Sequence, residues 1–300
     1  MNQNTSQYRS GYLAIVGRPN VGKSSLLNRI VGEKLAITSH KPQTTRHSIL
    51  GIKTTDQAQI VCVDTPGIHG RGDQPMNRYL NRTALTTLSG VDVLLFVVEA
   101  GRWMAEDEKV LKAIKESSLP VILAVNKVDL FKEKEVILPF LQEMGERHDF
   151  VEIIPVSARK SVNVDALVNR IISHLPEGEM IFPEDQLSDR SERFFAAEFI
   201  REQLTRRYDK EIPYALTVEI ERFEEDGDMY RIHGLVWVEK QGQKAILIGK
   251  NGEAMRDAST NARLAMERFF GRKVYLRVWV KVKKSWSSDE AALSSLGYGE

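Results

Sequence analysis

The sequence lacks several features that would each mark a particular class of protein. It has one cysteine, Cys62, so no disulfide can form within the chain, and a reducing compartment is expected. No cluster of His and Cys residues suggests a zinc site. The longest apolar runs, VDVLLFVV and LPVILAV, are too short to span a bilayer, and the first residues lack a secretory signal pattern. These absences predict a cytoplasmic protein.

The chain also lacks an excess of charge of either sign. Its formal net charge is +1, so the overall charge identifies no partner. With 42% hydrophobic and 28% charged residues, the composition is that of an ordinary globular protein. A length of 300 residues predicts about two domains, each able to bury a core.

The first half of the chain alternates short apolar runs with helical patterns. The strand-like runs are YLAIVG, AQIVCVDTPG, VDVLLFVVEA, PVILAVNKVD and EIIPVSA. The helical patterns include GKSSLLNRIVG, AEDEKVLKAIKES and VDALVNRIISHL. Apolar strands with helices between them predict an α/β domain, a mostly parallel sheet covered by helices on both faces. Ligands bind such sheets at the carboxyl ends of the strands.

The second half follows a different order. The segment from Leu175 to Ser191 is rich in proline, glycine and acidic residues, which is typical of a linker. After it the patterns predict helix, strand, strand, helix, helix, strand, a smaller α+β domain. The expected boundaries are a first domain at 8–178, a linker at 179–192, a second domain at 193–285 and a C-terminal tail at 286–300.

A glycine-rich loop, GRPNVGKS from Gly17 to Ser24, fits the pattern G-x-x-x-x-G-K-[ST] between a predicted strand and a predicted helix. Glycines let backbone N–H groups turn toward phosphate oxygens, and the start of the helix adds partial positive charge. Lys23 would contact the β- and γ-phosphates, and Ser24 would bind Mg²⁺. The loop predicts a nucleoside triphosphate site.

Two further motifs predict how the triphosphate and its base are bound. In DTPG, Asp64 would hold the Mg²⁺ shell and the Gly67 N–H would meet the γ-phosphate. In NKVD, Asp129 can accept two hydrogen bonds from guanine donors that adenine lacks, a discrimination of roughly 1–3 kcal/mol. Asn126 would reach another base edge, and the stem of Lys127 would cover the base plane. The nucleotide is therefore expected to be GTP or GDP.

A Ser-Ala pair at the end of the next predicted strand would present backbone N–H groups to the guanine oxygen. All the residues predicted to bind the nucleotide are Gly17, Arg18, Pro19, Asn20, Val21, Gly22, Lys23, Ser24, Asp64, Thr65, Pro66, Gly67, Ile68, Asn126, Lys127, Val128, Asp129, Ser157 and Ala158. Their order along the chain resembles that of the small GTP-binding proteins.

The residue after DTPG has a consequence for the rate. Ras-type enzymes have a glutamine there, which orients the attacking water, whereas this chain has Ile68. Isoleucine cannot hydrogen-bond water, so slow intrinsic turnover is expected, ~10⁻² s⁻¹ or below. His69 could contact the water instead, although a histidine facing solvent is the simpler interpretation. A hydroxyl from HKPQTTRHS must complete the Mg²⁺ shell, and Thr44 and Thr45 are the candidates.

A second glycine pair, Gly249 and Gly252, lies in ILIGKNG between two predicted helices. It is either an ordinary turn or the GXXG loop with which KH domains clamp single-stranded nucleotides. The order of elements resembles the second KH topology. The predicted RNA-binding residues are Gly249, Lys250, Asn251, Gly252, Arg256 and Arg263. Between Lys240 and Lys284 there are 12 basic and 3 acidic residues, a net +9 that favours binding to phosphates.

The last predicted strand alternates in a second way. Its apolar residues point to one side, whereas Tyr275, Arg277, Trp279, Lys281 and Lys283 point to the other. This row is either an ordinary solvated face or a surface for RNA or for docking against the first domain.

Together GRPNVGKSS, PQTTR, DTPGIH, NKVD and IGKNG resemble the Era family of bacterial GTPases over nearly the whole chain. The resemblance selects Thr45 as the Mg²⁺ ligand beside Ser24 and Asp64. It also gives Asn20 a catalytic role beside Lys23 and Thr45, as a ligand of K⁺. It implies a monomeric GTPase that binds 16S rRNA near its 3′ end and assists assembly of the small (30S) ribosomal subunit. GTP would control the engagement of RNA.

Two other functions fit part of the sequence. The first is an RNA-binding scaffold with a vestigial GTPase domain, which the presence of Lys23, Ser24 and Asp64 argues against. The second is a regulator that associates peripherally with the inner membrane, with the basic segment meeting anionic lipid.

Overall fold

The computed structural model of the 300-residue chain describes residues 7–41, 44–64, 90–209, 211–284, 286–289 and 293. These residues divide into two compact units. The first holds residues 7–36, 45–64 and 90–189, and the second holds 37–41, 44 and the described residues from 190 onward. One boundary between the units therefore falls between Thr44 and Thr45.

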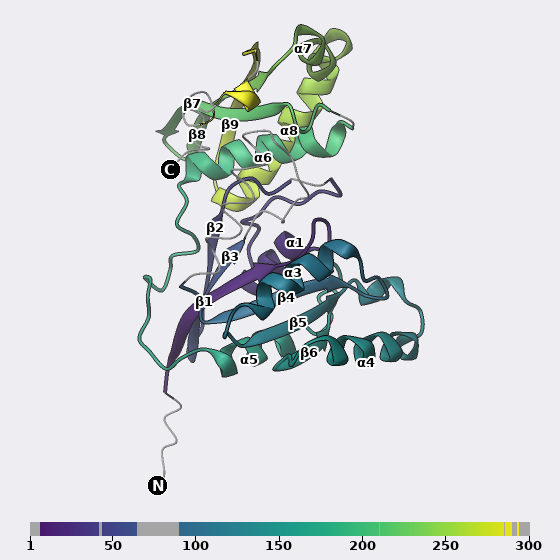
Figure 1. The fold of residues 1–300 in the computed structure, drawn as a ribbon. Helices are drawn as coiled ribbons and strands as arrows, with labels where there is room; N and C mark the ends of the chain where they lie inside the picture. Colours follow the sequence, from purple (N-terminus) through teal and green to yellow (C-terminus); the bar gives the residue numbers. More distant parts are fainter. Residues whose placement is uncertain are drawn as a thin grey trace. The chain divides into compact units, whose positions relative to one another are not determined.

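The first unit is built on a six-stranded sheet with the order β2-β3-β1-β4-β5-β6 (Figure 1). The strands are β1 (Arg9–Val16), β2 (Ile49–Thr54), β3 (Ala58–Asp64), β4 (Val93–Glu99), β5 (Val121–Asn126) and β6 (Glu152–Pro155). All neighbouring pairs are parallel except β2 with β3. The central strands are buried along their length, which is why their sequences read as continuous apolar runs.

Helices cover both faces of this sheet, as the sequence predicts (Figure 1). They are α1 (Lys23–Val31), α3 (Ala105–Lys115), α4 (Leu138–Arg147) and α5 (Val164–His174). Helices α1 and α5 contact each other over one face. Over the other face, Val110 and Leu111 of α3 and Met144 of α4 join one apolar cluster with Phe96 of β4. Burial in the sheet raises the pKa of Cys62 to about 12, so its thiol stays protonated.

The segment after α5 lies along the strands of the first unit rather than free of them. The Ser10 N–H donates to Pro176 O at 3.1 Å, and the Ile52 N–H donates to Leu187 O at 2.9 Å. The Gln59 amide donates to Phe182 O at 2.9 Å. The linker predicted at 179–192 stays a prediction, and these hydrogen bonds show that Pro176, Phe182 and Leu187 contact the strands of the first unit.

The second unit packs helices on one face of a three-stranded sheet with the order β7-β8-β9 (Figure 1). Its elements are α6 (Glu192–Arg207), β7 (Leu216–Asp226), β8 (Met229–Val238), α7 (Gln241–Ile248), α8 (Glu253–Phe270) and β9 (Lys273–Val282). β7 and β8 are antiparallel, whereas β8 and β9 are parallel. This is the order that the sequence predicts.

Aromatic side chains fill the space between the helices of the second unit. The ring of Phe269 on α8 lies 4.9 Å from that of Phe195 and 5.3 Å from that of Phe199, both on α6. Trp286 follows β9 in a short 3₁₀ turn, Trp286–Ser288, and is also buried. Its indole N–H donates to Ala215 O at 3.1 Å, so the segment after β9 begins docked in the core of this unit.

Among the described residues, no helix combines the length and the apolar character that a membrane-spanning helix needs.

Candidate active site

The glycine-rich loop joins the end of β1 to the start of α1. Gly22 precedes the helix with φ of 103°, a left-handed conformation that L side chains rarely adopt. A Cβ atom at this position would lie 2.3 Å from the amide nitrogen of Asn126. Glycine is therefore required here both by backbone conformation and by the close approach of the Asn126 side chain.

Lys23 is buried inside the loop that it belongs to. Its ammonium group donates to the carbonyl oxygens of Gly17 and Arg18 at 2.9 and 3.0 Å. Burial lowers the pKa of Lys23 to about 8, and the carboxylate of Asp64 acts in the opposite direction. The loop thus holds a buried ammonium group. Phosphate oxygens of a bound nucleotide would accept its hydrogen bonds in place of the two carbonyl oxygens.

Three oxygen-bearing side chains from separate elements meet beside this loop. Ser24 at the start of α1 lies with its Oγ 2.8 Å from Thr45 Oγ1 and 2.9 Å from Asp64 Oδ2. Thr45 Oγ1 and Asp64 Oδ2 are 3.5 Å apart. The structure therefore brings together the three predicted Mg²⁺ ligands.

The carboxylate of Asp64 suits a cation. It is fully buried at the end of β3, and its Oδ1 has no hydrogen-bond partner within the described part of the chain. Burial raises the pKa of Asp64 to about 6, against the charge of Lys23 and the hydrogen bonds from Ser24 and Thr45. An orphaned carboxylate oxygen with two hydroxyl groups is a set of hard oxygen donors, which Mg²⁺ prefers. The residues present fit this metal.

The structure also distinguishes between the two candidate threonines. The hydroxyl of Thr44 is engaged elsewhere, donating to Lys41 O at 2.7 Å and lying 2.8 Å from Ser39 Oγ. Only Thr45 of the two contacts Ser24 and Asp64.

The predicted base-reading residues converge at the ends of β5 and β6. The Asn126 amide donates to Val21 O at 2.7 Å and accepts the Ala158 N–H at 3.0 Å. Both polar ends of this side chain therefore tie the glycine-rich loop to the loop after β6. Contact of Asn126 with a base edge stays a prediction. Ser157 Oγ donates to Asp129 Oδ1 at 2.6 Å, which orients the carboxylate expected to bind guanine.

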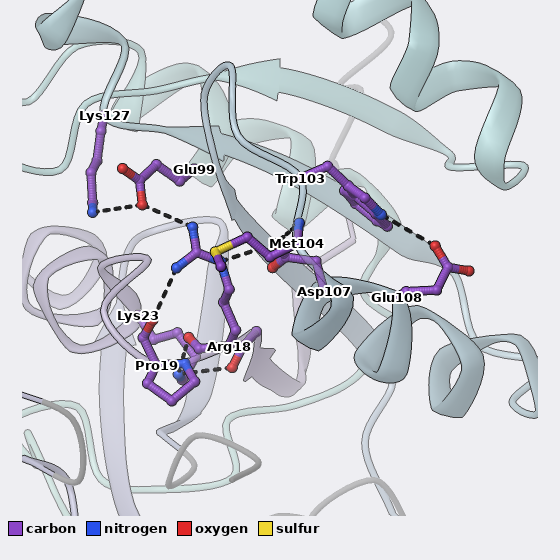
Figure 2. A network of polar contacts seen from close by, with 10 residues as sticks. Arg18, Pro19, Lys23, Glu99, Trp103, Met104, Asp107, Glu108 and Lys127 are labelled. Carbon is purple, nitrogen blue, oxygen red and sulfur yellow. Dashed lines mark hydrogen bonds and ion pairs between the residues drawn. The ribbon is translucent and has the colours of Figure 1, made fainter. Parts of the chain in front are cut away.

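An ion-pair network not anticipated from the sequence joins the phosphate loop to the base loop (Figure 2). Arg18 donates through Nη2 to Glu99 Oε2 at 2.9 Å and through Nε to Asp107 Oδ2 at 3.0 Å. The same Glu99 oxygen lies 3.1 Å from the ammonium of Lys127. Glu99 therefore bridges Arg18 of the first loop and Lys127 of the other.

The two carboxylates of this network have different electrostatic surroundings. Burial raises the pKa of Asp107, and Arg18 only partly offsets the effect. Partial burial also acts to raise the pKa of Glu99, but hydrogen bonds and charges of Lys127 and Arg18 outweigh it and hold this pKa below its usual value. Glu99 is therefore the anion that fixes Lys127 at neutral pH.

Replacing Glu99 by glutamine tests its role in holding Lys127. We expect E99Q to weaken the binding of GTP and GDP equally, by about threefold to tenfold, because Lys127 is predicted to cover the base that both share. Titration with fluorescent guanine nucleotides measures both constants. E108Q is the matched control, since Glu108 lies outside this network: it accepts the indole N–H of Trp103 at 3.2 Å (Figure 2) and pairs with Arg147 at 3.4 Å. Unequal effects on GTP and GDP would contradict the role.

Some predicted residues lie outside the described part of the chain. They are Thr65, Pro66, Gly67 and Ile68, together with His69, the residue weighed as a partner for the attacking water. Their predicted contacts with the γ-phosphate and the water stay predictions.

The second glycine pair lies between α7 and α8. Gly249 has φ of 72°, and a Cβ atom there would lie 2.6 Å from Ala254 Cβ, so the turn requires glycine. Lys250 and Asn251 are exposed at the tip of the loop. Arg256 on α8 is exposed, whereas Arg263 pairs with Glu267 at 2.8 Å. The loop therefore offers a cation on backbone that another molecule can approach closely.

Fold and sites together define a P-loop GTPase unit followed by a KH unit. Residues 12–127 match the family described as 50S ribosome-binding GTPase, and residues 211–287 match the KH domain family. The match of each family falls in one of the two parts that the sequence separates, which confirms both predicted fold classes.

Whole-chain comparisons identify the family. The chain is 51% identical to GTPase Era of Xanthomonas axonopodis pv. citri (strain 306), over 99% of this chain and all of that relative. It is 53% identical to GTPase Era of Pseudomonas aeruginosa (strain LESB58), over 97% and 96% of the two chains. The chain belongs to the Era family of GTPases and is a GTP hydrolase, as the sequence motifs predict.

Two solved structures match nearly the whole chain with a TM-score of 0.94 and 37% identity. One is a variant of Aquifex aeolicus Era bound to GDP and AlF₄⁻, covering 97% of this chain and 100% of the other. The second is Era in complex with MgGDPNP and nucleotides 1506–1542 of 16S ribosomal RNA, covering 98% and 100%.

Proposed function

We propose that this GTPase uses Mg²⁺ and the γ-phosphate of GTP to control RNA binding by its KH unit. Ser24, Thr45 and Asp64 would hold the Mg²⁺, which neutralises charge on the β- and γ-phosphates when bound. Lys23 would contact the same phosphates, and Asp129 would select guanine. The boundaries predicted from the sequence, 8–178 for the GTPase domain and 193–285 for the KH domain, are kept as proposals.

The observation that carries this proposal is the position of the segment before Thr45. Residues 37–41 and 44 belong to the compact unit of α6. The Thr38 N–H donates to Glu202 Oε1 at 3.0 Å, and Arg201 donates to Thr44 O at 2.6 Å. Glu202 and Arg201 are buried. The peptide bond after Thr44 then leads directly to the hydroxyl beside Ser24 and Asp64.

This continuity gives a physical route for coupling. When the γ-phosphate is present, Thr45 would be drawn to the Mg²⁺ shell, and the residues just before it are fixed to α6 of the KH unit. Hydrolysis would release Thr45 and allow the residues just before it to move. Because this short segment is joined to the metal site at Thr45 and to α6 by its hydrogen bonds, the nucleotide state can change the RNA affinity of the KH unit.

Replacing Thr45 by valine, which keeps the shape and removes the hydroxyl, tests the coupling. We expect T45V to slow GTP hydrolysis by about tenfold to a hundredfold, because mutations of residues around a bound metal lower activity by this factor. GDP binding should be unchanged. T45V should also make RNA affinity independent of whether GDP or GDPNP is bound.

T44V is the matched control. The hydroxyl of Thr44 contacts Ser39 and Lys41 rather than Asp64, so hydrolysis should persist. Equal loss of hydrolysis in both variants would contradict the assignment of Thr45.

The proposed RNA is 16S rRNA near its 3′ end. The Era structure with nucleotides 1506–1542 supports this target, given the similarity over the whole chain. The exposed Lys250 and the net +9 between Lys240 and Lys284 supply the charge that phosphate binding needs. Because 16S rRNA belongs to the small subunit, we propose a role in assembly of the 30S particle.

K⁺ is the proposed second cation. Asn20 is exposed in the phosphate loop with φ of 64°, the position that the family resemblance assigns to a K⁺ ligand. We expect GTP turnover to be at least about tenfold faster in K⁺ than in Na⁺ buffers, because an extra charge would stabilise the transition state. N20G keeps the left-handed backbone and should remove the difference. Equal wild-type rates in the two salts would contradict the role.

Two other predictions stay open to direct tests. Flotation with anionic liposomes tests peripheral membrane contact by the basic segment. Sedimentation equilibrium tests the predicted monomer.

A further inference from the structure

The open face of the β7-β8-β9 sheet carries a regular row of side chains. Gly234 of β8 faces the helices, because a Cβ atom there would lie 2.7 Å from Ile200 Cδ1 of α6. Side chains at odd positions of β8 and β9 therefore point to the opposite face. On β9 these are Lys273, Tyr275, Arg277, Trp279 and Lys281.

Two aromatic rings in this row are open to solvent. Tyr275 and Trp279 are each 40% exposed, so part of each aromatic side chain is accessible to another molecule. On β8, Leu235 is paired with Trp279 in the sheet and is only 1% exposed, and the ring of His233 lies 5.2 Å from that of Trp279. The sheet thus presents two aromatic rings on one face, four residues apart along β9.

Cations accompany the rings on the same face. The guanidinium of Arg277 lies 5.6 Å from the ring centre of Trp279, and that of Arg231 lies 5.5 Å from the ring centre of Tyr275. Lys281 lies 5.8 Å from the ring centre of Trp237 on β8. The β9 row alternates cation and ring at intervals of about 6.6 Å, twice the rise of a strand.

The third strand gives the same face an acidic side. Glu219 of β7 accepts the indole N–H of Trp237 at 2.9 Å, and Glu221 lies 3.3 Å from the ammonium of Lys281. The face is therefore divided, with Glu219, Glu221 and an Arg222–Glu224 ion pair along β7 and a basic, aromatic row along the edge strand β9.

We propose that this row is a second RNA-binding surface, separate from the GXXG loop and dependent on the proposed function. Its ligand is a single strand running along β9. Bases would stack on Tyr275 and Trp279, and phosphates would meet Arg277 and Lys281. Stacking platforms flanked by cations bind single strands in this way.

The pattern favours a strand of RNA over a lipid surface. A linear alternation of ring and cation matches a linear polymer that alternates base and phosphate. An anionic membrane would instead cover the whole face, including the carboxylates of Glu219 and Glu221 on β7, which it would repel.

Two variants of the full chain separate stacking from charge, with the 37-nucleotide RNA 1506–1542 as the probe. Y275T/W279T should weaken binding by about tenfold or more, because each lost stacking contact has an effect of this order. It should leave the salt dependence unchanged. Threonine suits a strand, so the sheet should be retained.

R277Q/K281Q should instead reduce the slope of log K against log salt by about 1.4, the value for two phosphate contacts with a single strand. K109Q/K112Q removes the same charge from exposed positions of α3 and should leave the slope unchanged. Zero-length ultraviolet crosslinking of the wild-type complex should label Tyr275 or Trp279.

The results separate this surface from the proposed function. The proposed surface is wrong if both double variants keep the wild-type RNA affinity and salt slope, if no crosslink forms on β9, and if K250D/N251D still loses RNA binding. If Y275T/W279T loses binding to anionic vesicles instead of RNA, the face binds lipid and the proposal is wrong. If the wild-type protein does not bind the RNA, the proposed function fails as well.

Discussion

Replacing Asp129 by asparagine should change the nucleotide that the protein prefers and should weaken GTP binding by about a hundredfold. The carboxylate can accept hydrogen bonds from both the ring N–H and the exocyclic amino group of guanine. An amide places a donor against one of these donors. Xanthine carries an oxygen where guanine carries the amino group, so D129N should bind xanthosine triphosphate more tightly than the wild-type protein does.

The geometry around Asp129 makes this a change of chemistry and not of fold. The residue lies in a short 3₁₀ turn, Val128–Leu130, after Lys127 with its left-handed φ of 68°. Asparagine can still accept the hydrogen bond that Ser157 donates at 2.6 Å. D149N, at an exposed position of the same unit, is the control. If D129N keeps wild-type GTP affinity, or if the wild-type protein binds ATP as tightly as GTP, the base assignment is wrong.

The second large effect is expected at the GXXG loop. K250D/N251D replaces a cation with carboxylates at the exposed tip and should weaken RNA binding by at least about a hundredfold, because phosphate contacts dominate such affinities. Both positions tolerate aspartate. Lys250 is exposed, and Asn251, with φ of 52°, has a conformation that aspartate also adopts. Substituting Gly249 would confuse the test, since its Cβ would meet Ala254.

The control for this variant changes the same charge elsewhere. K109A/K112D on α3 also lowers the net charge by three, at exposed positions of the GTPase unit. RNA affinity should persist in this control, and GTP turnover without RNA should persist in K250D/N251D. Equal losses of RNA binding in the two variants would indicate a general effect of charge and would contradict a clamp at the loop.

Much of the fold could be predicted because the sequence follows local rules consistently. The buried strands β3 and β5 are continuous apolar runs, and the motifs follow them directly at the sheet edge where ligands bind. In the second unit, alternation in β9 and the glycine pair between α7 and α8 predicted the element order. Turn residues and periodicity carry this information within short windows.

Features that depend on distant contacts could not be predicted. Glu99 and Asp107 look like a strand end and the first turn of a helix, and only the fold brings both to Arg18. Two elements were not predicted from the sequence, the edge strand β2 and the helix α4. Each contains an internal glycine, Gly51 and Gly145, which weakens its local pattern. The same holds for Thr38 and Thr44, which precede Thr45 closely in the chain but whose hydrogen bonds to α6 join residues more than 150 positions apart.

The measurement that tests the central claim most directly is the affinity of the full-length protein for RNA 1506–1542 in two nucleotide states. With GDPNP bound, we expect RNA to bind at least about tenfold more tightly than with GDP bound, within the usual range of coupling between sites. The Era complex that holds MgGDPNP and this RNA together supports that direction. Dissociation constants equal within about twofold in the two states would contradict control of RNA binding by the γ-phosphate.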